Sequence, residues 1–124
     1  MYPERAYGIL LSVTDMSKPT DLVQGTLDLL ILKALILAAL HGWAISKRIR
    51  QMSDDILEVG QGSLYPALYR LEEKGWISSE WGISSEGRRA KFYSLTTAGR
   101  ESFLAEQSTW RRFSGAVERV LEAN

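Results

Sequence analysis

The sequence predicts an α+β fold that is mainly α and carries one small β-hairpin. Three observations predict it: apolar-rich helical segments near both ends, a short amphipathic helical segment between them, and a run of β-forming residues broken by glycine and serine. With 124 residues and 45% hydrophobic content, the chain has the size and apolar content of one domain with a core.

A first helix is expected over residues 26–40, ended by His41 and Gly42. Apolar residues surround it, so it must be covered on nearly all sides. A membrane span would need about 20 nearly uncharged residues, and Asp28 and Lys33 lie in its first half. We therefore expect a helix between the core and a second subunit. The residues expected at that interface are Leu27, Leu30, Ile31 and Leu35.

A second helix is expected over residues 44–52, and residues 53–62 link it to a third. This arrangement is a helix-turn-helix whose turn is longer than the minimal form. The residues expected on the inner face are Ala44, Ile45, Ile49 and Met52, and those on the outer face are Lys47, Arg48 and Arg50.

Pro66 and Gly75 bound the third helix. Proline lacks an N–H and is tolerated in a first turn, so the helix should begin at Ser63 as N-cap. Gly75 should end it in the left-handed conformation. At 100° per residue the helix has two distinct faces. The inward residues are Leu64, Ala67, Leu68 and Leu71, and the outward residues are Tyr65, Pro66, Tyr69 and Arg70.

A β-hairpin is expected next, with strands at residues 76–81 and 91–95 and a turn at 82–87. Tyr93 and Leu95 share a face at period two and should point inward. Four cations and no acid lie between residues 87 and 100, in a chain of net charge zero. These cations are Arg88, Arg89, Lys91 and Arg100.

The last helix should begin after Thr96, its expected N-cap, and continue to about Leu121, with Gly99 a weak point in its first turn. Five apolar residues recur at separations of seven, three, four and four, which is a heptad-like seam. Such a helix needs a partner, and the first helix of a second copy is the natural one. The seam residues are Phe103, Trp110, Phe113, Val117 and Leu121.

An exposed helix end followed by a basic hairpin is the layout of a winged helix-turn-helix that docks on DNA. Alone, the helix would be read as an ordinary surface helix and the tip as a solvated turn. Together they favour contact with a duplex. A net charge of zero argues against a protein that coats nucleic acid by electrostatic attraction alone, and it predicts modest DNA affinity per monomer.

Enzymatic and metal functions find no support in the sequence. His41 is the single histidine and cysteine is absent, so no metal site and no cofactor is predicted. The segment 60–62 lacks the rest of a phosphate loop or nucleophile elbow. Zero cysteines fit a reducing cytoplasm.

The chain resembles the PadR family of bacterial transcriptional regulators. The resemblance rests on QGTLDLLILKAL (24–35), HGWAI (41–45), GSLYP (62–66), RLE (70–72), WI (76–77), Trp81, RRAK (88–91), YSLT (93–96) and GR (99–100). It implies the compact branch with one C-terminal helix, a homodimer formed through the first and last helices, and usually repression. Some members bind aromatic ligands beside a tryptophan, and Trp110 has a similar place. The alternative is that Trp110 binds no ligand and only anchors the dimer interface.

Residues 1–20 match nothing in this family. Two interpretations stay open: a misassigned extension before Met16, or a disordered arm. The apolar run 9–11 is too short for a secretory signal. We expect the DNA-binding domain to span residues 21–96 and the dimerisation helix residues 97–124.

The expected function is a cytoplasmic, homodimeric regulator, most simply a repressor, bound to a palindromic operator in double-stranded DNA. The alternatives are a sensor of small aromatic effectors and a protein-interaction module that does not touch DNA. The residues expected at the major groove are Ser63, Tyr65, Pro66 and Tyr69, with Arg70 reaching a base or the backbone. Those expected at phosphates or the minor groove are Arg88, Arg89 and Lys91, with Lys47 and Arg48 adding backbone contacts.

Overall fold

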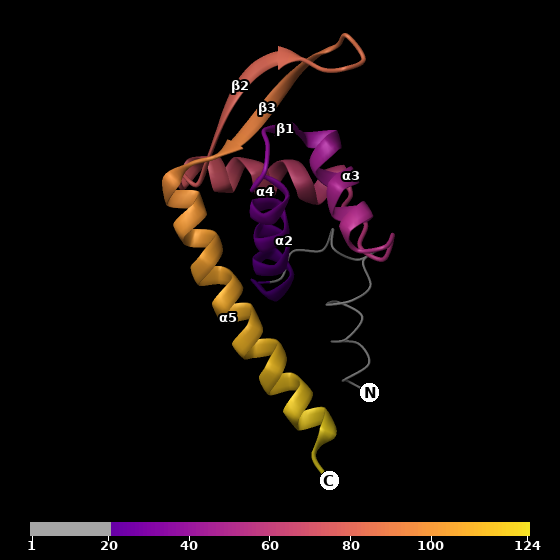
Figure 1. Ribbon diagram of the computed structural model, residues 1–124, viewed down its shortest axis with the longest axis vertical. Helices are drawn as coiled ribbons and strands as arrows, with labels where there is room; N and C mark the ends of the chain where they lie inside the picture. Colours follow the sequence, from indigo (N-terminus) through magenta and orange to yellow (C-terminus); the bar gives the residue numbers. More distant parts are fainter. Residues whose placement is uncertain (1–20) are drawn as a thin grey trace.

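The computed structural model describes residues 21–124 as four helices and a three-stranded antiparallel sheet, which confirms the predicted fold class (Figure 1). A long helix leads away from the hairpin, and the other helices gather beside its first half. The elements are α2 (Asp21–Ala34), β1 (Leu40–His41), α3 (Gly42–Met52), α4 (Gln61–Glu73), β2 (Ile77–Ile83), β3 (Arg89–Leu95) and α5 (Thr97–Glu122). The predicted extension, residues 1–20, lies outside the described residues.

The core lies where α2 meets α3, α4 and α5. The apolar face predicted for α4 is buried there together with Ile45 and Ile49 of α3. Met52 was predicted to point inward and is half exposed, because α3 ends there and the core lies toward the other end of the helix. The side chains with almost no exposed surface are Ile31, Leu32, Ile45, Ile49, Leu64, Leu68, Leu71 and Ile77.

The predicted dimer interface needs a correction. Leu27 and Ile31 of α2, and Leu35 directly after it, are buried inside a single copy of the chain, and so is Phe103 of α5. α3, α4 and α5 of the same copy pack against α2, so these side chains offer no surface to a second subunit. Of the four residues predicted at the interface near the first helix, Leu30 alone is half-buried, and the other three are buried.

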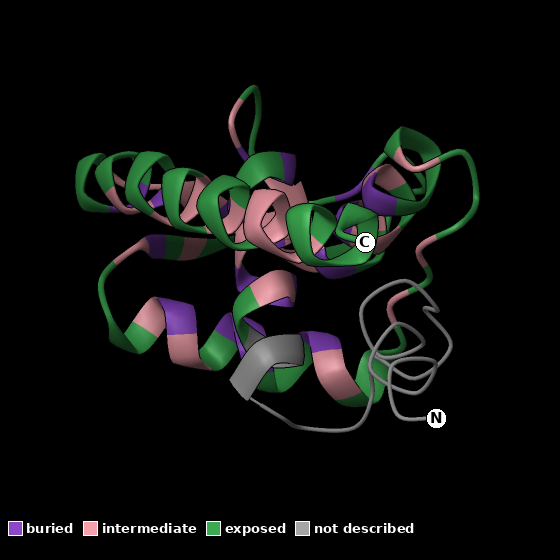
Figure 2. Cartoon of the chain, turned by 90° about the horizontal axis from the view of Figure 1, so that it is seen from below, coloured by how far each residue is buried: buried purple, intermediate pink, exposed green. Residues whose placement is uncertain are grey.

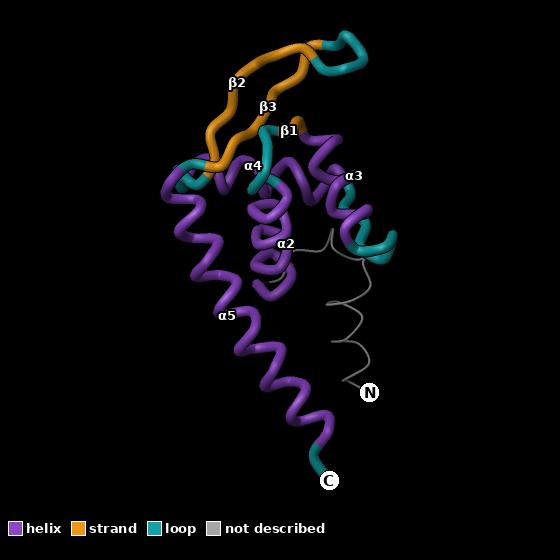
Figure 3. The backbone as a smooth tube through the Cα atoms, in the orientation of Figure 1, coloured by secondary structure: helices purple, strands orange, loops and turns teal. Residues whose placement is uncertain are grey.

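The first helix begins and ends earlier than the predicted range of residues 26–40, and the chain forms a short strand after it. α2 ends at Ala34, and Leu40 and His41 pair with Tyr93 and Phe92 at the free edge of β3 (Figure 3). An apolar run does not reveal such a pairing, because its partner lies about fifty residues away in the sequence. His41 therefore does not close the first helix. Its Nδ1 accepts the Ala44 N–H at 3.3 Å and caps α3.

α4 begins two residues before the predicted N-cap Ser63. Gly60 is the N-cap, and its carbonyl accepts the N–H groups of Ser63 and Leu64. The helix therefore carries Pro66 in its second turn. The missing N–H removes one hydrogen bond to the carbonyl of Gly62, and Gly62 is exposed, so water can satisfy that carbonyl. The predicted end is confirmed: Gly75 follows the helix with φ +78°.

The start of α5 is fixed against the base of the hairpin. Thr96 caps the helix as predicted, its Oγ1 accepting the Gly99 N–H at 3.0 Å and donating to the Gly75 carbonyl at 2.7 Å. Gly99 is not a weak point: it is buried, and a Cβ there would overlap the backbone carbonyl of Trp76. Glycine at this position permits the close approach. The far end of α5 is exposed (Figure 2).

Candidate nucleic-acid interface

One concave surface, which we call the wing cavity, joins the hairpin, the first turns of α4 and the start of α3. Its volume is about 850 Å³. Residues that are distant in the sequence meet here because β1 ties the start of α3 to β3, the inner strand of the hairpin. Aromatic and basic side chains in its lining include Trp43, Tyr65, Trp81, Arg88, Arg89 and Lys91.

The outer face of α4 presents aromatic groups to solvent, as predicted. Tyr65 is 44% exposed and Tyr69 65% exposed, and Pro66 is also exposed. Ser63 is half-buried in the first turn. Hydrogen bonding to the Glu73 carboxylate raises the pKa of the Tyr69 hydroxyl. The end of α4 nearest the wing cavity therefore offers a phenol ring and a proline ring on a rigid helix.

Arg70 has a partner within the protein. Its Nη2 lies 2.8 Å from Oδ1 of Asp28, which is nearly buried in α2. Burial raises the pKa of the Asp28 carboxyl, and the neighbouring Arg70 guanidinium offsets part of that rise. The guanidinium therefore faces α2, and its geometry favours holding α4 in place over the predicted contact with DNA.

The hairpin tip is a tight turn that presents cations. The Ser84 N–H donates to the Arg88 carbonyl at 2.8 Å, and Gly87 takes φ +81°. Arg88 and Arg89 are exposed. The Arg89 guanidinium lies 4.4 Å from the centre of the Trp81 ring, so an aromatic face holds this cation in place.

Lys91 lies nearer the base of the hairpin and is partly neutralised. Its Nζ is 3.8 Å from Oε1 of Glu72, whose other carboxylate oxygen accepts the Ser79 hydroxyl at 2.6 Å. Tyr93 and Leu95 point inward as predicted: Tyr93 is buried and Leu95 packs on the core. Of the predicted cations, Arg88 and Arg89 are thus the ones best placed to meet phosphates, whereas Arg100 is on α5 and not on the hairpin.

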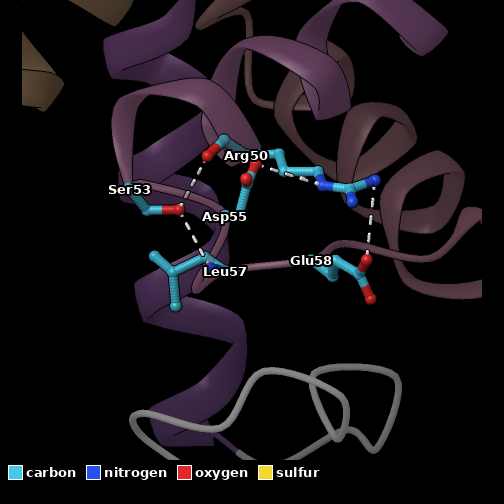
Figure 4. Close-up of polar contacts among 5 residues, drawn as sticks. All are labelled: Arg50, Ser53, Asp55, Leu57 and Glu58. Atoms are coloured by element: carbon cyan, nitrogen blue, oxygen red, sulfur yellow. Dashed lines mark hydrogen bonds and ion pairs between the residues drawn. The ribbon is translucent and has the colours of Figure 1, made fainter.

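α3 adds a cation beside the wing cavity. Lys47 is exposed, with its Nζ 4.9 Å from the centre of the Trp43 ring, while Arg48 is half-buried. Arg50 lies in the last turn of α3, and its guanidinium reaches into the turn between α3 and α4, to Asp55 at 3.4 Å and Glu58 at 3.6 Å (Figure 4). Ser53 adds to this turn by accepting the Leu57 N–H at 2.9 Å. The turn is therefore braced, although its ion pairs are exposed and each contributes little.

Sequence reasoning missed Trp43 and Trp81 as lining residues of the wing cavity. A signal for Trp81 was present, because it stands directly opposite Lys91 in the hairpin register and so shares its face. No local signal pointed to Trp43, because its position depends on the pairing of β1 with β3.

A second, smaller cavity of about 210 Å³ lies between α2 and α5. Leu29, Trp110 and Phe113 line it, and the rings of Trp110 and Phe113 are 5.9 Å apart. Within the described residues, no cluster of three His, Asp or Glu side chains could hold a metal ion. The described helices also include none that is long and apolar enough to cross a membrane.

Comparison with known proteins identifies the family. The model of the transcriptional regulator PadR-like family matches residues 31–105. The chain belongs to this family. The match begins inside α2 and ends in the first turns of α5, so it includes every element that lines the wing cavity.

Solved structures agree with this assignment. A transcriptional regulator from Clostridium thermocellum is 29% identical, with a TM-score of 0.72 over 81% of this chain and 97% of that one. A PadR family transcription regulator from Clostridium difficile is 31% identical, with a TM-score of 0.65 over 77% of this chain and 97% of that one. A 37.1 kDa protein of a Streptomyces fradiae transposon is 43% identical over 73% of this chain, which spans 24% of that protein.

We predict that Asp28 gives the protein an unusual dependence of stability on pH. The pKa of this carboxyl is raised on folding, so the folded chain binds more protons than the unfolded chain, and the free energy of unfolding falls as pH rises through the folded pKa. The stabilisation is fully present below the unfolded value of about 3.9. Denaturant unfolding between pH 3 and pH 7 should show this fall in the free energy of unfolding in the wild type, and the contribution of Asp28 to it should be missing in Asp28→Asn. A component that grows with rising pH would contradict the prediction.

Proposed function

We propose that the protein is a homodimeric, sequence-specific DNA-binding repressor of transcription that acts in the bacterial cytoplasm. The observation that carries the proposal is the wing cavity, where Tyr65 of α4 and the exposed Arg88 and Arg89 of the hairpin line one concave surface. Arginines bind phosphates and read grooves, and a helix that presents its N-terminal end reads base edges in the major groove.

The proposal gives a role to residues of the wing cavity and to residues of α3 and α4 beside it. Ser63, Tyr65, Pro66 and Tyr69 contact the major groove, while Arg88 and Arg89 hold the flanking phosphates or minor groove. Lys91 and Lys47 add positive charge at the edges of the site, and the half-buried Arg48 adds a backbone contact. We assign Arg70 to positioning, because its guanidinium is already paired with Asp28.

The second half of α5 supports the homodimer. This part of the helix leads beyond the packed helices (Figure 1) and keeps its apolar seam uncovered. Val120 is 74% exposed, Leu121 54% and Phe113 40%. A seam of this kind buries its surface by packing on another copy. The revised interface therefore uses Trp110, Phe113, Val117, Val120 and Leu121 with the half-buried Leu30.

A two-fold dimer predicts the form of the operator. The half-sites would be palindromic and separated by one helical turn of DNA, about 10 bp, or a multiple of it. Repression would follow from competition with polymerase for the promoter.

A second candidate function rests on the cavity between α2 and α5. Its aromatic walls at Trp110 and Phe113 suit a flat apolar effector. Binding there would change how α5 meets its partner, and so the spacing of the two wing cavities.

Removing Arg88 and Arg89 together should weaken binding to all duplexes and reduce the salt dependence of log Kd by about two units of slope. The measurement is fluorescence anisotropy with fragments enriched from a random duplex library, over a range of salt concentrations. Arg111→Ala/Arg112→Ala removes the same charge from exposed positions on α5 and should leave the slope unchanged. If no fragment is enriched, or if the salt dependence is unchanged in Arg88→Ala/Arg89→Ala, the result favours the alternative function, a protein-interaction module that does not touch DNA.

Leu121→Asp should convert the dimer into monomers at micromolar concentration, because a carboxylate would enter an apolar interface. Sedimentation equilibrium measures the mass directly. Leu104→Asp is the matched control: Leu104 is also exposed and apolar, but it lies about 100° around the helix from Phe103, outside the seam. A wild-type monomer, or equal effects of both substitutions, would exclude this interface.

Planar aromatic compounds should quench tryptophan fluorescence saturably if the α2–α5 cavity is an effector site. The quench should be lost in Trp110→Phe while the other three tryptophans remain. A quench that survives this substitution would place the ligand elsewhere.

A further inference from the structure

Gly42 lies where α3, the sheet and α4 meet. It is buried, it is the first residue of α3, and it follows directly after β1. His41 before it pairs with Phe92 of β3. Gly42 also lines the wing cavity beside Tyr65. Its position is therefore fixed both by the sheet and by the start of a helix.

The Tyr65 ring occupies the space that a side chain at Gly42 would need. A Cβ built on Gly42 would lie 2.5 Å from the Tyr65 hydroxyl oxygen, 2.8 Å from Cζ and 3.0 Å from Cε1. All three of these nearest atoms belong to the tyrosine. The end of the phenol therefore rests on the bare backbone at the start of α3.

The backbone at Gly42 does not itself require glycine. Only Gly75 and Gly87 have a positive φ among the described glycines. The first turn of a helix accepts alanine, which has a higher helix propensity than glycine. What glycine supplies here is room for the Tyr65 ring.

We propose that Gly42 is a positioning residue for DNA recognition: by lacking a side chain, it sets the direction in which Tyr65 presents its hydroxyl to the duplex. This inference rests on the proposed function, in which Tyr65 contacts the major groove. It adds a residue of α3 that touches no DNA and acts through α4.

The physical consequence of Gly42→Ala is a displaced ring in a folded protein. The obstructing atoms are the far end of a side chain that is 44% exposed, so the ring can swing into solvent. Gly99 is the opposite case, because there a Cβ meets the backbone of Trp76, which cannot move aside.

The test is a double-mutant cycle on a duplex enriched from a random library. Gly42→Ala should weaken binding roughly tenfold, the size of one lost base contact. Tyr65→Ala should weaken it to a similar extent, and Gly42→Ala/Tyr65→Ala should be no weaker than Tyr65→Ala alone. Gly25→Ala is the matched control, since a Cβ there meets nothing within 4 Å. It should bind like the wild type.

The inference would be overturned if the affinity losses of the two single variants multiplied in Gly42→Ala/Tyr65→Ala. It would also be overturned if Gly42→Ala bound DNA with wild-type affinity. Wild-type affinity of Tyr65→Ala would overturn it too, while DNA binding itself would stand. If Gly42→Ala alone fails to fold, a folded Gly42→Ala/Tyr65→Ala variant would support the steric conflict directly.

A readout without DNA separates this inference from the proposed function. In ¹³C-tyrosine spectra, the Tyr65 ring resonance, assigned with Tyr65→Phe, should shift in Gly42→Ala and stay in place in Gly25→Ala. If no duplex is enriched, the proposed function fails while this spectrum still reports on the contact. An unshifted resonance would overturn the positioning role whatever the DNA result.

Discussion

The burial of α2 is the constraint on which the rest of this small fold depends. Ile31 and Leu32 have no exposed surface, and α3, α4 and α5 all pack against this one helix. Apolar surface removed from water stabilises by roughly 25 cal/mol per Å², so a helix that is apolar on nearly every side holds three neighbours at once. Asp28 of α2 also helps to set the orientation of α4 on α2, because it forms an ion pair with Arg70 of α4. The orientation of α4, the helix that we propose reads DNA, is thus determined by contacts inside the protein.

The hairpin is held to the same helices at its base and along one edge. At its base, Thr96 bonds to the carbonyl of Gly75 through its hydroxyl and to that of Trp76 through its N–H, which joins the ends of α4, β2 and β3 to α5. At its inner edge, β1 pairs with β3 and continues directly into α3. Only the tip that carries Arg88 and Arg89 projects freely. A rigid base with a projecting cationic tip suits a hairpin that must meet DNA at a set distance from a helix.

Local chemistry in the sequence predicted much of the fold and part of the site. Thr96 as a cap, Gly75 as a helix end, the buried face of α4 and the inward Tyr93 all follow from periodicity and capping. The larger corrections share one cause, which is contact between residues distant in the sequence. Leu40 was predicted as helix because the partner strand of β1 lies far along the chain, and the pairing of Arg70 with Asp28 was not foreseen because the two residues lie far apart in the sequence. The α2 interface was misassigned because an all-round apolar helix does not show which neighbour covers it. Its neighbours are α3, α4 and α5 of the same copy.

Hydrogen–deuterium exchange on binding an enriched duplex tests the central claim most directly: that the start of α4 and the hairpin tip form one DNA-contacting surface. The account predicts slowed exchange in residues 61–69 and 84–91 together, with little change in the second half of α5. Protection confined to α5, or protection of α4 with none in the hairpin, would contradict it.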